Sequence, residues 1–226
     1  DVLFKGNDFK IKQEFKSYVM ENILFKISFP AEFHAQTAVE AAVTLHPEVI
    51  NKLEEIEKIV ITTHESAIRI ISKEGDLNNP ADRDHCLQYM VAIALLKGNL
   101  VAEDYEDSVA KDPRIDVLRG KMIVNEDKRY SKEYLEADKR SIANRIQIHF
   151  NDGTSTEDCE VEYPIGHMRR REEGIPVLEK KFMNNLNITY TEEVANKIFK
   201  LCMDQRKLEE TSVLDFQSLL SKKTQN

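Results

Sequence analysis

The clearest alternation of hydrophobic and polar residues lies on either side of an Asn-Asp-Gly sequence at 151–153. The hydrophobic members of this pattern are Ile146, Ile148 and Phe150 before the sequence and Cys159, Val161 and Tyr163 after it. Successive side chains of a strand point to opposite faces, so strict alternation predicts a strand with one buried face. Asn, Asp and Gly are typical turn residues. The pattern therefore predicts an antiparallel hairpin over 143–163 with this hydrophobic set buried.

Elsewhere the pattern changes between strand and helix along the chain. β-Branched residues predict two more strands, over 56–63 and 121–125. Helical spacing of hydrophobic residues predicts helices over 30–45, 82–97, 101–110, 113–119, 175–186, 191–210 and 213–220. The segment 65–72 fits no single pattern. Together these elements predict an α+β fold, with a small, mostly antiparallel sheet and helices packed on one face.

Residues at the predicted helix ends agree with the chemistry of helix termini. Pro30 suits a first helical turn, because proline has no N–H to leave unpaired there. Pro47 is expected to end the same helix. Gly98 follows the helix over 82–97, in a position that favours a residue tolerant of positive φ. Thr191 is a candidate N-cap for the helix that begins there.

The composition is that of an ordinary globular protein, with 41% hydrophobic and 32% charged residues. A net charge of −8 disfavours a general nucleic-acid-binding protein. No hydrophobic run approaches the roughly 20 residues that a membrane-spanning helix needs, so we expect no membrane partner. Cys86, Cys159 and Cys202 form no Cys-x-x-Cys pair, which disfavours a zinc site or an iron–sulfur cluster. We therefore predict no metal and no cofactor.

The first 29 residues carry six aromatic side chains and no clear period. These aromatic residues are Phe4, Phe9, Phe15, Tyr18, Phe25 and Phe29. A patch of this kind is unfavourable in water, so we expect the segment to lie against another surface. The chain is thereby divided into an aromatic arm over 1–29, an α+β domain over 30–190 and C-terminal helices over 191–226.

Four stretches of the chain together resemble one protein family. They are KISFPAEFHAQTAVEAA (26–42), NNPADRDHCLQYMVAIALL (78–96), DKRSIANRIQIHFNDGT (138–154) and VEYPIGHMRRREEGIP (161–176). In this order they are similar to the C-terminal half of the MmgE/PrpD family, and they span most of the chain. Family members carry in addition a helical N-terminal half that is missing here, and this chain begins with Asp1 rather than Met. We therefore interpret the chain as a fragment of a larger enzyme.

The resemblance implies both a fold and an activity. Family members combine a helical domain with a smaller α+β lid, so this chain would carry the lid, and residues 191–226 would return to the helical domain. The implied activity is removal of water from 2-methylcitrate to give 2-methyl-cis-aconitate in propionate breakdown, without an iron–sulfur cluster. The implied partners are the tricarboxylate substrate, the missing N-terminal half and a second copy in a homodimer. The implied location is the bacterial cytoplasm or the mitochondrial matrix, and the fragment alone should be inactive.

His34 is the candidate catalytic residue, because an imidazole can take up and release a proton near neutral pH. Glu32 and Gln36 flank it at the start of a predicted helix, where free N–H groups favour a bound carboxylate or phosphate. Lys26 and His85 are further candidate substrate-binding residues. A buried structural histidine fits the same pattern, because His34 shares one helical face with small hydrophobic residues.

A second candidate binding segment follows the Tyr-Pro-Ile-Gly sequence that ends at Gly166. His167, Arg169 and Arg170 are its candidate substrate-binding residues, because guanidinium groups bind carboxylates through paired hydrogen bonds. The three consecutive arginines at 169–171 cannot all point the same way. At least one of them is expected to face solvent or to pair with a neighbouring glutamate.

Two alternatives to the dehydratase interpretation stay open. Related members of the superfamily act as decarboxylases or epimerases on similar acids, and an α+β interaction module would use the aromatic arm to bind a partner. Binding of an acid near His34 and the arginines would separate an enzyme from such a module. His46, His64 and His149 have no second residue suited to a ligand set or a triad, so we assign them no site role.

Overall fold

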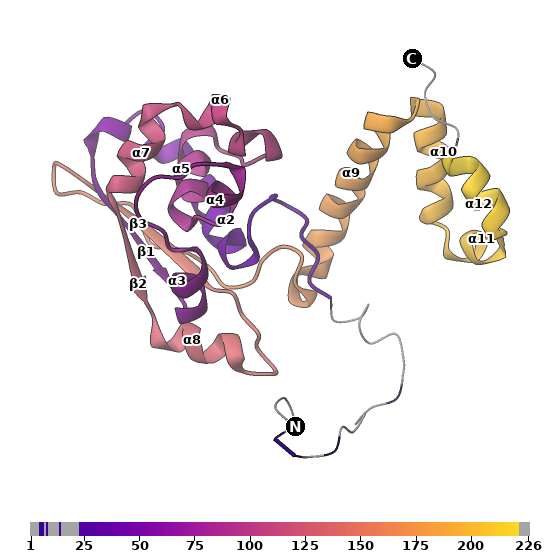
Figure 1. Cartoon of the computed structure of the whole chain (residues 1–226), viewed down its shortest axis with the longest axis horizontal. Helices are drawn as coiled ribbons and strands as arrows, with labels where there is room; N and C mark the ends of the chain where they lie inside the picture. Colours follow the sequence, from indigo (N-terminus) through magenta and orange to yellow (C-terminus); the bar gives the residue numbers. More distant parts are fainter. Residues whose placement is uncertain (1–4, 7, 9–13, 15–22, 222–226) are drawn as a thin grey trace.

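The computed structural model describes residues 5–6, 8, 14 and 23–221, and it confirms the α+β fold (Figure 1). Four strands form one sheet in the order β2-β1-β3-β4. The strands are β1 Ile56–Thr63, β2 Met122–Glu126, β3 Asn144–Phe150 and β4 Cys159–Val161.

The sheet is mixed, with two antiparallel pairings and one parallel pairing. β3 runs antiparallel to both β1 and β4. β1 and β2 run parallel, with Ile59 opposite Met122 and Thr63 opposite Glu126. Parallel neighbours need a long connection, and several helices fill the chain between these two strands. As a result, β1 and β2 end at the same edge of the sheet.

The predicted antiparallel hairpin is confirmed, with Asn144 opposite Val161. Its second strand is less buried than predicted, because Cys159, Val161 and Tyr163 are only half-buried. Side chains of β3 alternate between buried and half-buried along the whole strand.

β4 is shorter than predicted, since it ends at Val161 and Tyr163 lies outside it. The ring centroid of Tyr163 is 4.5 Å from that of His167. Hydrogen bonding to the neighbouring segment continues as far as the carbonyl of Glu162, which accepts from the N–H of Ile142 at 3.1 Å. Pro164 beyond it has no N–H to donate to a neighbouring strand.

Helices cover one face of the sheet (Figure 1). They are α2 Gln36–Val49, α3 Glu65–Ile71, α4 Pro80–Asp84, α5 Leu87–Lys97, α6 Asp107–Ala110, α7 Pro113–Gly120 and α8 Lys128–Leu135. α2 packs against α5 and lies over β3 and β4. Every residue of α5 except Lys97 is buried, so α5 runs through the centre of the hydrophobic core. Gly98 ends α5 with a φ of 67°, as its position in the sequence predicted.

α2 begins and ends later than predicted. Pro30 lies in a bend, and a short 3-10 helix, η1 Phe33–Ala35, comes before α2. Pro47 lies inside the last turn of α2 instead of ending it. A proline there removes only one backbone hydrogen bond. The helix closes beyond it, because the N–H of Ile50 donates to the carbonyl of His46 at 2.9 Å.

Two long predicted helices are each interrupted. The helix expected over 82–97 divides at His85 and Cys86, because the hydrophobic run starts only at Cys86 and the polar turn before it folds separately as α4. The helix expected over 191–210 divides before Asp204, whose side chain accepts a hydrogen bond from the N–H of Lys207 and so starts a new helix.

Two more segments differ from expectation. The segment 101–110 forms a 3-10 helix, η3 Ala102–Tyr105, followed by α6. α8 was not predicted, because polar residues dominate its sequence. Asp127 starts α8 by accepting a hydrogen bond from the N–H of Arg129 at 2.8 Å. α3 and α8 lie together at one end of the sheet (Figure 1).

The C-terminal helices form a separate group with its own small core (Figure 1). They are α9 Arg171–Thr189, α10 Glu192–Cys202, α11 Gln205–Glu210 and α12 Val213–Leu220. Leu186 of α9 packs with Ala195 and Ile198 of α10 in this core. Thr191 caps α10 as predicted, accepting a hydrogen bond from the N–H of Val194 at 3.4 Å. Over the described ranges, no helix combines the length and the apolar character needed to span a membrane.

The aromatic arm is only partly covered by the described residues. Phe29 packs against the main core, and the guanidinium of Arg171 lies 4.4 Å from the centroid of the Phe25 ring. The division of the chain at residues 29 and 190 stays a prediction. The other aromatic residues of the arm lie outside the described residues, namely Phe4, Phe9, Phe15 and Tyr18.

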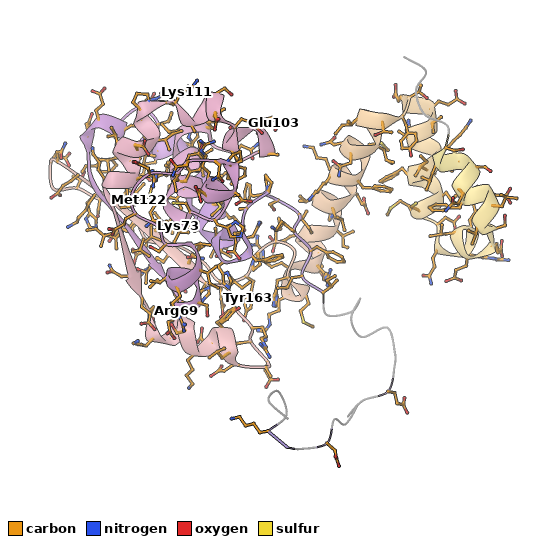
Figure 2. All side chains as sticks on the ribbon, viewed as in Figure 1. Arg69, Lys73, Glu103, Lys111, Met122 and Tyr163 are labelled. Atoms are coloured by element: carbon orange, nitrogen blue, oxygen red, sulfur yellow. The ribbon has the colours of Figure 1, made fainter. Side chains whose placement is uncertain are left out.

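The backbone at Phe25 lies very close to the backbone at Gly166. Figure 2 shows Tyr163, three residues before Gly166, near the start of α9. The N–H of Phe25 donates to the carbonyl of Gly166 at 3.2 Å. A Cβ atom on Gly166 would lie 1.6 Å from the carbonyl oxygen of Phe25. This close approach of two chain segments therefore requires a residue without a side chain at position 166.

Gly166→Ala should lower the free energy of unfolding by about 2–3 kcal/mol, because one segment must move to admit the methyl group. The matched control is Gly120→Ala at the end of α7, where an added Cβ meets no atom within 4 Å. Urea unfolding of both variants measures the difference. Equal stability of the two variants would contradict the close approach.

Candidate active site

Glu32 and His34 form a hydrogen-bonded carboxylate–imidazole pair at the start of η1. The carboxylate of Glu32 accepts a hydrogen bond from the backbone N–H of His34 at 2.8 Å and so caps this short helix. The same carboxylate lies 2.8 and 2.9 Å from Nδ1 of His34. An ionised carboxylate can only accept, so Nδ1 is the donor and Nε2 of the neutral ring carries the lone pair. Burial raises the pKa of Glu32, but the hydrogen bonds from His34 outweigh burial and leave that pKa below its usual value.

Tyr134 of α8 completes a line of three polar groups. Its hydroxyl lies 3.2 Å from Nε2 of His34, on the opposite side of the ring from Glu32. α8 is fixed to the body by Ser131, whose hydroxyl accepts from the N–H of Glu65 at 2.9 Å. The line therefore joins a turn near residue 32 to a helix about 100 residues further along the chain.

His64 lies directly beneath this line, at the end of β1. Its side chain is 0% exposed, and its ring centroid is 5.1 Å from that of His34 and 4.6 Å from that of Tyr134. The rings of His64 and Tyr134 are nearly parallel, at 18°. Neither ring nitrogen of His64 has a hydrogen-bond partner among the described residues.

The buried ring of His64 is neutral at pH 7. Burial lowers the pKa of His64, its electrostatic interaction with His34 lowers it as well, and Glu32 opposes this only in part, so the resulting pKa is about 4. The sequence had given His64 no role, because its partners come from distant segments. The available signal was its position directly after a strand, at the edge where the parallel strands end.

Asn144 fixes the backbone of the site to the sheet. It is 0% exposed, and its Nδ2 donates to the carbonyl oxygen of His34 at 2.8 Å and to Oγ1 of Thr37 at 2.7 Å. The hydroxyl of Thr37 in turn donates to the carbonyl of Ile142 at 2.5 Å. These bonds hold η1 and the first turn of α2 against the start of β3.

Two other candidate residues, Gln36 and Lys26, have partners other than the His34 side chain. Gln36 is buried, and its Nε2 donates to the carbonyls of Phe29 and Ala31 at 2.9 and 2.8 Å, so it closes the turn before η1. Lys26 is exposed, with its Nζ 5.6 Å from the centroid of the ring of Phe33 in η1. The ammonium group of Lys26 therefore lies against Phe33 of η1, next to His34 in the chain.

His85 and His167 have their own local partners. His85 is exposed at the end of α4, and its Nδ1 lies 2.5 Å from a carboxylate oxygen of Asp84. His167 is buried, and its Nδ1 accepts a hydrogen bond from the N–H of Arg169 at 3.2 Å. Burial lowers the pKa of His167, and the positive charges of Arg169 and Arg171 lower it further.

The three consecutive arginines point to three different places, as their spacing predicted. Arg170 forms a bidentate pair with Glu40 of α2, at 2.8 and 3.0 Å, and it also pairs with Glu173. Arg169 lies 5.0 Å from the centroid of the Tyr163 ring. Arg171 covers Phe25, as described above. The side chain of Arg170 therefore joins α2 to α9 within this chain.

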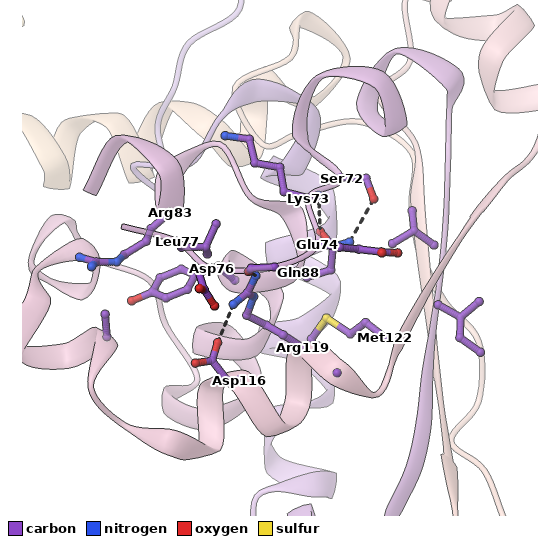
Figure 3. A pocket seen from close by; sticks show the side chains of 16 residues that line it. Ser72, Lys73, Glu74, Asp76, Leu77, Arg83, Gln88, Asp116, Arg119 and Met122 are labelled. Atoms are coloured by element: carbon purple, nitrogen blue, oxygen red, sulfur yellow. Dashed lines mark hydrogen bonds and ion pairs between the residues drawn. The ribbon is translucent and has the colours of Figure 1, made fainter. Parts of the chain in front are cut away.

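A cleft of about 940 Å³ lies elsewhere, between α5, α7, β2 and the loop over 72–77 (Figure 3). Its charged lining residues are Lys73, Arg83, Arg119, Glu74, Asp76 and Asp116, so the two signs balance. Arg119 is already held by Asp116 at 2.5 Å and by the carbonyl of Gly75 at 2.9 Å. His34, His64 and Tyr134 do not line it. We place the candidate active site at His34, where acid–base groups converge, and not in this cleft.

The described part of the chain contains no group of three His, Cys, Asp or Glu side chains arranged to hold a metal ion. Cys86 is buried, Cys159 and Cys202 are half-buried, and all three are free thiols.

Comparison with known proteins gives one family and several close relatives. The sequence model described as the MmgE/PrpD C-terminal domain matches residues 29–205. The chain is 53% identical over 222 residues to the 2-methylcitrate dehydratase of Escherichia coli strain K12, covering 97% of this chain and 46% of that protein.

Relatives from other organisms give the same picture. The chain is 57% identical over 202 residues to the mitochondrial 2-methylcitrate dehydratase of Yarrowia lipolytica, covering 88% of this chain and 39% of that protein. It is 51% identical over 219 residues to the 2-methylcitrate dehydratase of Cupriavidus necator, covering 96% and 45%. The chain therefore spans about half the length of the curated relatives that it matches.

Arg170→Ala should lower the free energy of unfolding by about 2–3 kcal/mol, because it leaves the half-buried carboxylate of Glu40 without its partner. Arg169→Ala is the matched control and should cost less than about 1 kcal/mol, since Arg169 is exposed. Chemical unfolding of both variants at neutral pH measures the difference. A stable Arg170→Ala protein would show that this arginine is free to bind something else.

His64 should make the chain less stable as the pH falls. At pH 7 His64 is neutral in both the folded and the unfolded state. Below pH 6.5 the unfolded state takes up a proton that the folded state, with a pKa of about 4, refuses. Its contribution to the loss of unfolding free energy between pH 7 and 4.5 should be about 2 kcal/mol.

Urea unfolding at pH 7 and pH 4.5 measures this effect. His64→Gln should remove about 2 kcal/mol of the loss, whereas His149→Gln, on the polar face of β3, should keep the full loss. An unchanged loss in the His64→Gln protein would rule out a buried neutral imidazole.

Proposed function

Because this chain belongs to the MmgE/PrpD family through its C-terminal domain, we propose that it forms the C-terminal part of a 2-methylcitrate dehydratase. The observation that carries this proposal is 53% identity, over 97% of the chain, to an enzyme of that name. The Glu32–His34 pair supports it independently, since a dehydratase needs a positioned acid–base group.

The proposed reaction removes water from 2-methylcitrate to give 2-methyl-cis-aconitate. A C–H bond next to a carboxylate breaks, and its electron pair forms the new carbon–carbon double bond. The C–O bond to the hydroxyl on the neighbouring carbon breaks, and the hydroxide leaves as water after it gains a proton. The reaction therefore needs a base for the carbon, an acid for the hydroxyl and positive groups for the carboxylates.

His34 is the proposed base. Glu32 keeps the proton on Nδ1, so Nε2 carries the lone pair that accepts a proton from carbon. The carboxylate of Glu32 also stabilises the imidazolium that results, as the aspartate of a Ser-His-Asp triad does. His64 beneath the ring is neutral and adds no competing positive charge at pH 7.

The proposed carboxylate-binding groups are divided between the two halves of the enzyme. Lys26 is exposed near η1 and is the candidate on this chain. Arg170 is occupied by Glu40 and Glu173, so it is a poorer candidate than the sequence suggested. We propose that the N-terminal half supplies the remaining cations, and that this chain alone is inactive. A homodimer stays a prediction, and relatives occur both in bacteria and, by name, in mitochondria.

The direct test is to assay the full-length protein on 2-methylcitrate. Formation of the conjugated double bond, followed by ultraviolet absorbance, supports the dehydratase. Release of carbon dioxide indicates a decarboxylase, and a change of optical rotation without a new double bond indicates an epimerase. If a folded full-length protein catalyses none of these three reactions, the result favours the non-enzymatic interaction module.

His34→Gln in the full-length protein should lower kcat by about 10²–10⁴-fold, the usual effect of losing a positioned acid–base group. KM should change less, because the carboxylates bind elsewhere. His149→Gln is the matched control, about 16 Å away along β3 from the end at Asn144, and should leave kcat unchanged. Normal turnover in a stable His34→Gln protein would remove the catalytic assignment.

A further inference from the structure

Three side chains from two distant segments form one continuous line of hydrogen bonds. Glu32 contacts Nδ1 of His34 at 2.8 Å, and the hydroxyl of Tyr134 contacts Nε2 at 3.2 Å. With Nδ1 held as the donor, the neutral ring can only accept at Nε2, so the Tyr134 hydroxyl donates to it. A carboxylate, an imidazole and a hydroxyl in this order can pass a proton between the imidazole and the hydroxyl.

This line lies within reach of a bound molecule. The side chains of His34 and Glu32 are 12% and 15% exposed, and Tyr134 is half-buried. His64, by contrast, is completely enclosed and cannot touch a substrate. Tyr134 is therefore the group beside His34 that can present a proton to a ligand at this surface.

We propose that Tyr134 is a further catalytic residue, which donates the proton that converts the departing hydroxide into water. The proposal rests on the dehydratase function proposed above and assigns the acid that this function requires.

The step balances without any additional proton donor. When the substrate binds, the Tyr134 hydroxyl turns from Nε2 of His34 to the hydroxyl of the substrate and leaves the Nε2 lone pair open. Nε2 then takes the proton from the carbon, and the electron pair of the C–H bond forms the double bond. The C–O bond breaks, and the leaving oxygen takes the proton of the Tyr134 hydroxyl. The oxygen of Tyr134 then recovers a proton from Nε2 of His34 across the 3.2 Å contact. Water departs, and both side chains return to their starting protonation states.

The surroundings of Tyr134 hold its hydroxyl in place for this transfer. One face of its ring stacks on His64, with 4.6 Å between centroids. α8, which carries Tyr134, is fixed on one side by the ion pair of Arg129 with Glu160 at 3.0 Å. On the other side Lys139 pairs with Glu133 at 2.8 Å. A phenol held in this way loses little freedom when the substrate binds.

Tyr134→Phe in the full-length enzyme tests the proposal, because it keeps the ring that stacks on His64 and removes only the hydroxyl. We expect kcat for 2-methylcitrate to fall by about 10²-fold or more, with little change in KM. Tyr190→Phe is the matched control. Its hydroxyl bonds to the carbonyl of Leu220 at 2.9 Å among the C-terminal helices, so its loss should leave kcat unchanged.

A second substrate separates an acid from a structural tyrosine. In the analogue that carries chloride in place of the hydroxyl, the leaving group departs without a proton. Tyr134→Phe should therefore turn over this analogue at nearly the normal rate, whereas His34→Gln should fail on both substrates. If Tyr134 only supports the fold, the Tyr134→Phe enzyme will lose the same factor on both substrates, and that result overturns the proposal.

The outcomes also distinguish this proposal from the function on which it rests. An unmodified full-length enzyme that does not dehydrate 2-methylcitrate refutes the proposed function. An enzyme that does so, together with a Tyr134→Phe variant of normal kcat, refutes the role of Tyr134 alone.

Discussion

The close packing of α2 against α5 and the sheet is the constraint on which the rest of the structure depends. Ala38, Ala41 and Ala42 of α2 are all 0% exposed, and their small side chains let the helix lie near its neighbours. α5 is buried on almost every side, so the position of α2 is fixed by contact and not by charge. The start of α2 consequently lies beside the start of β3, where Asn144 bonds to the carbonyl of His34, and near the end of β1. The candidate site exists because hydrophobic packing brings these three segments together.

The electrostatics of the site follow from this burial. Glu32 and His34 lie at the rim, where their polar groups keep part of their hydration, and the interior position below them holds the uncharged ring of His64. A second positive histidine at that depth would oppose protonation of His34. The low pKa of His64, about 4, therefore has two effects. The buried His64 ring stays uncharged at neutral pH. Proton transfer at the site therefore involves only Glu32, His34 and Tyr134 among these residues. The cost is stability in acid, because the unfolded chain accepts a proton that the folded chain refuses.

Most of the cations near the hairpin serve the fold. Arg170 ties α2 to α9 through Glu40, and Arg171 covers Phe25 where the backbones at Phe25 and Gly166 lie close together. The half-buried guanidinium of Arg170 already binds the carboxylates of Glu40 and Glu173, so it is poorly available to a carboxylate of a substrate. This distribution of charge agrees with a chain that spans about half the length of its relatives. It supports the proposal that part of the binding site comes from the other half.

The sequence by itself determined the features that depend on short-range rules. Alternation predicted the hairpin around 151–153, and Gly98 marked the end of α5. The choice of His34 as candidate base rests on the chemistry of imidazole together with the family resemblance, because spacing alone also fitted a buried structural histidine. Interactions outside those rules moved the boundaries: Pro47 stays inside α2, and the helix over 82–97 divides at Cys86. Only the tertiary structure decided which groups surround His34. His64 and Tyr134 lie 30 and 100 residues beyond it, and no local pattern connects them. The parallel pairing of β1 with β2 and the packing of α8 bring them together, because burial and strand register act between segments that are distant in the chain.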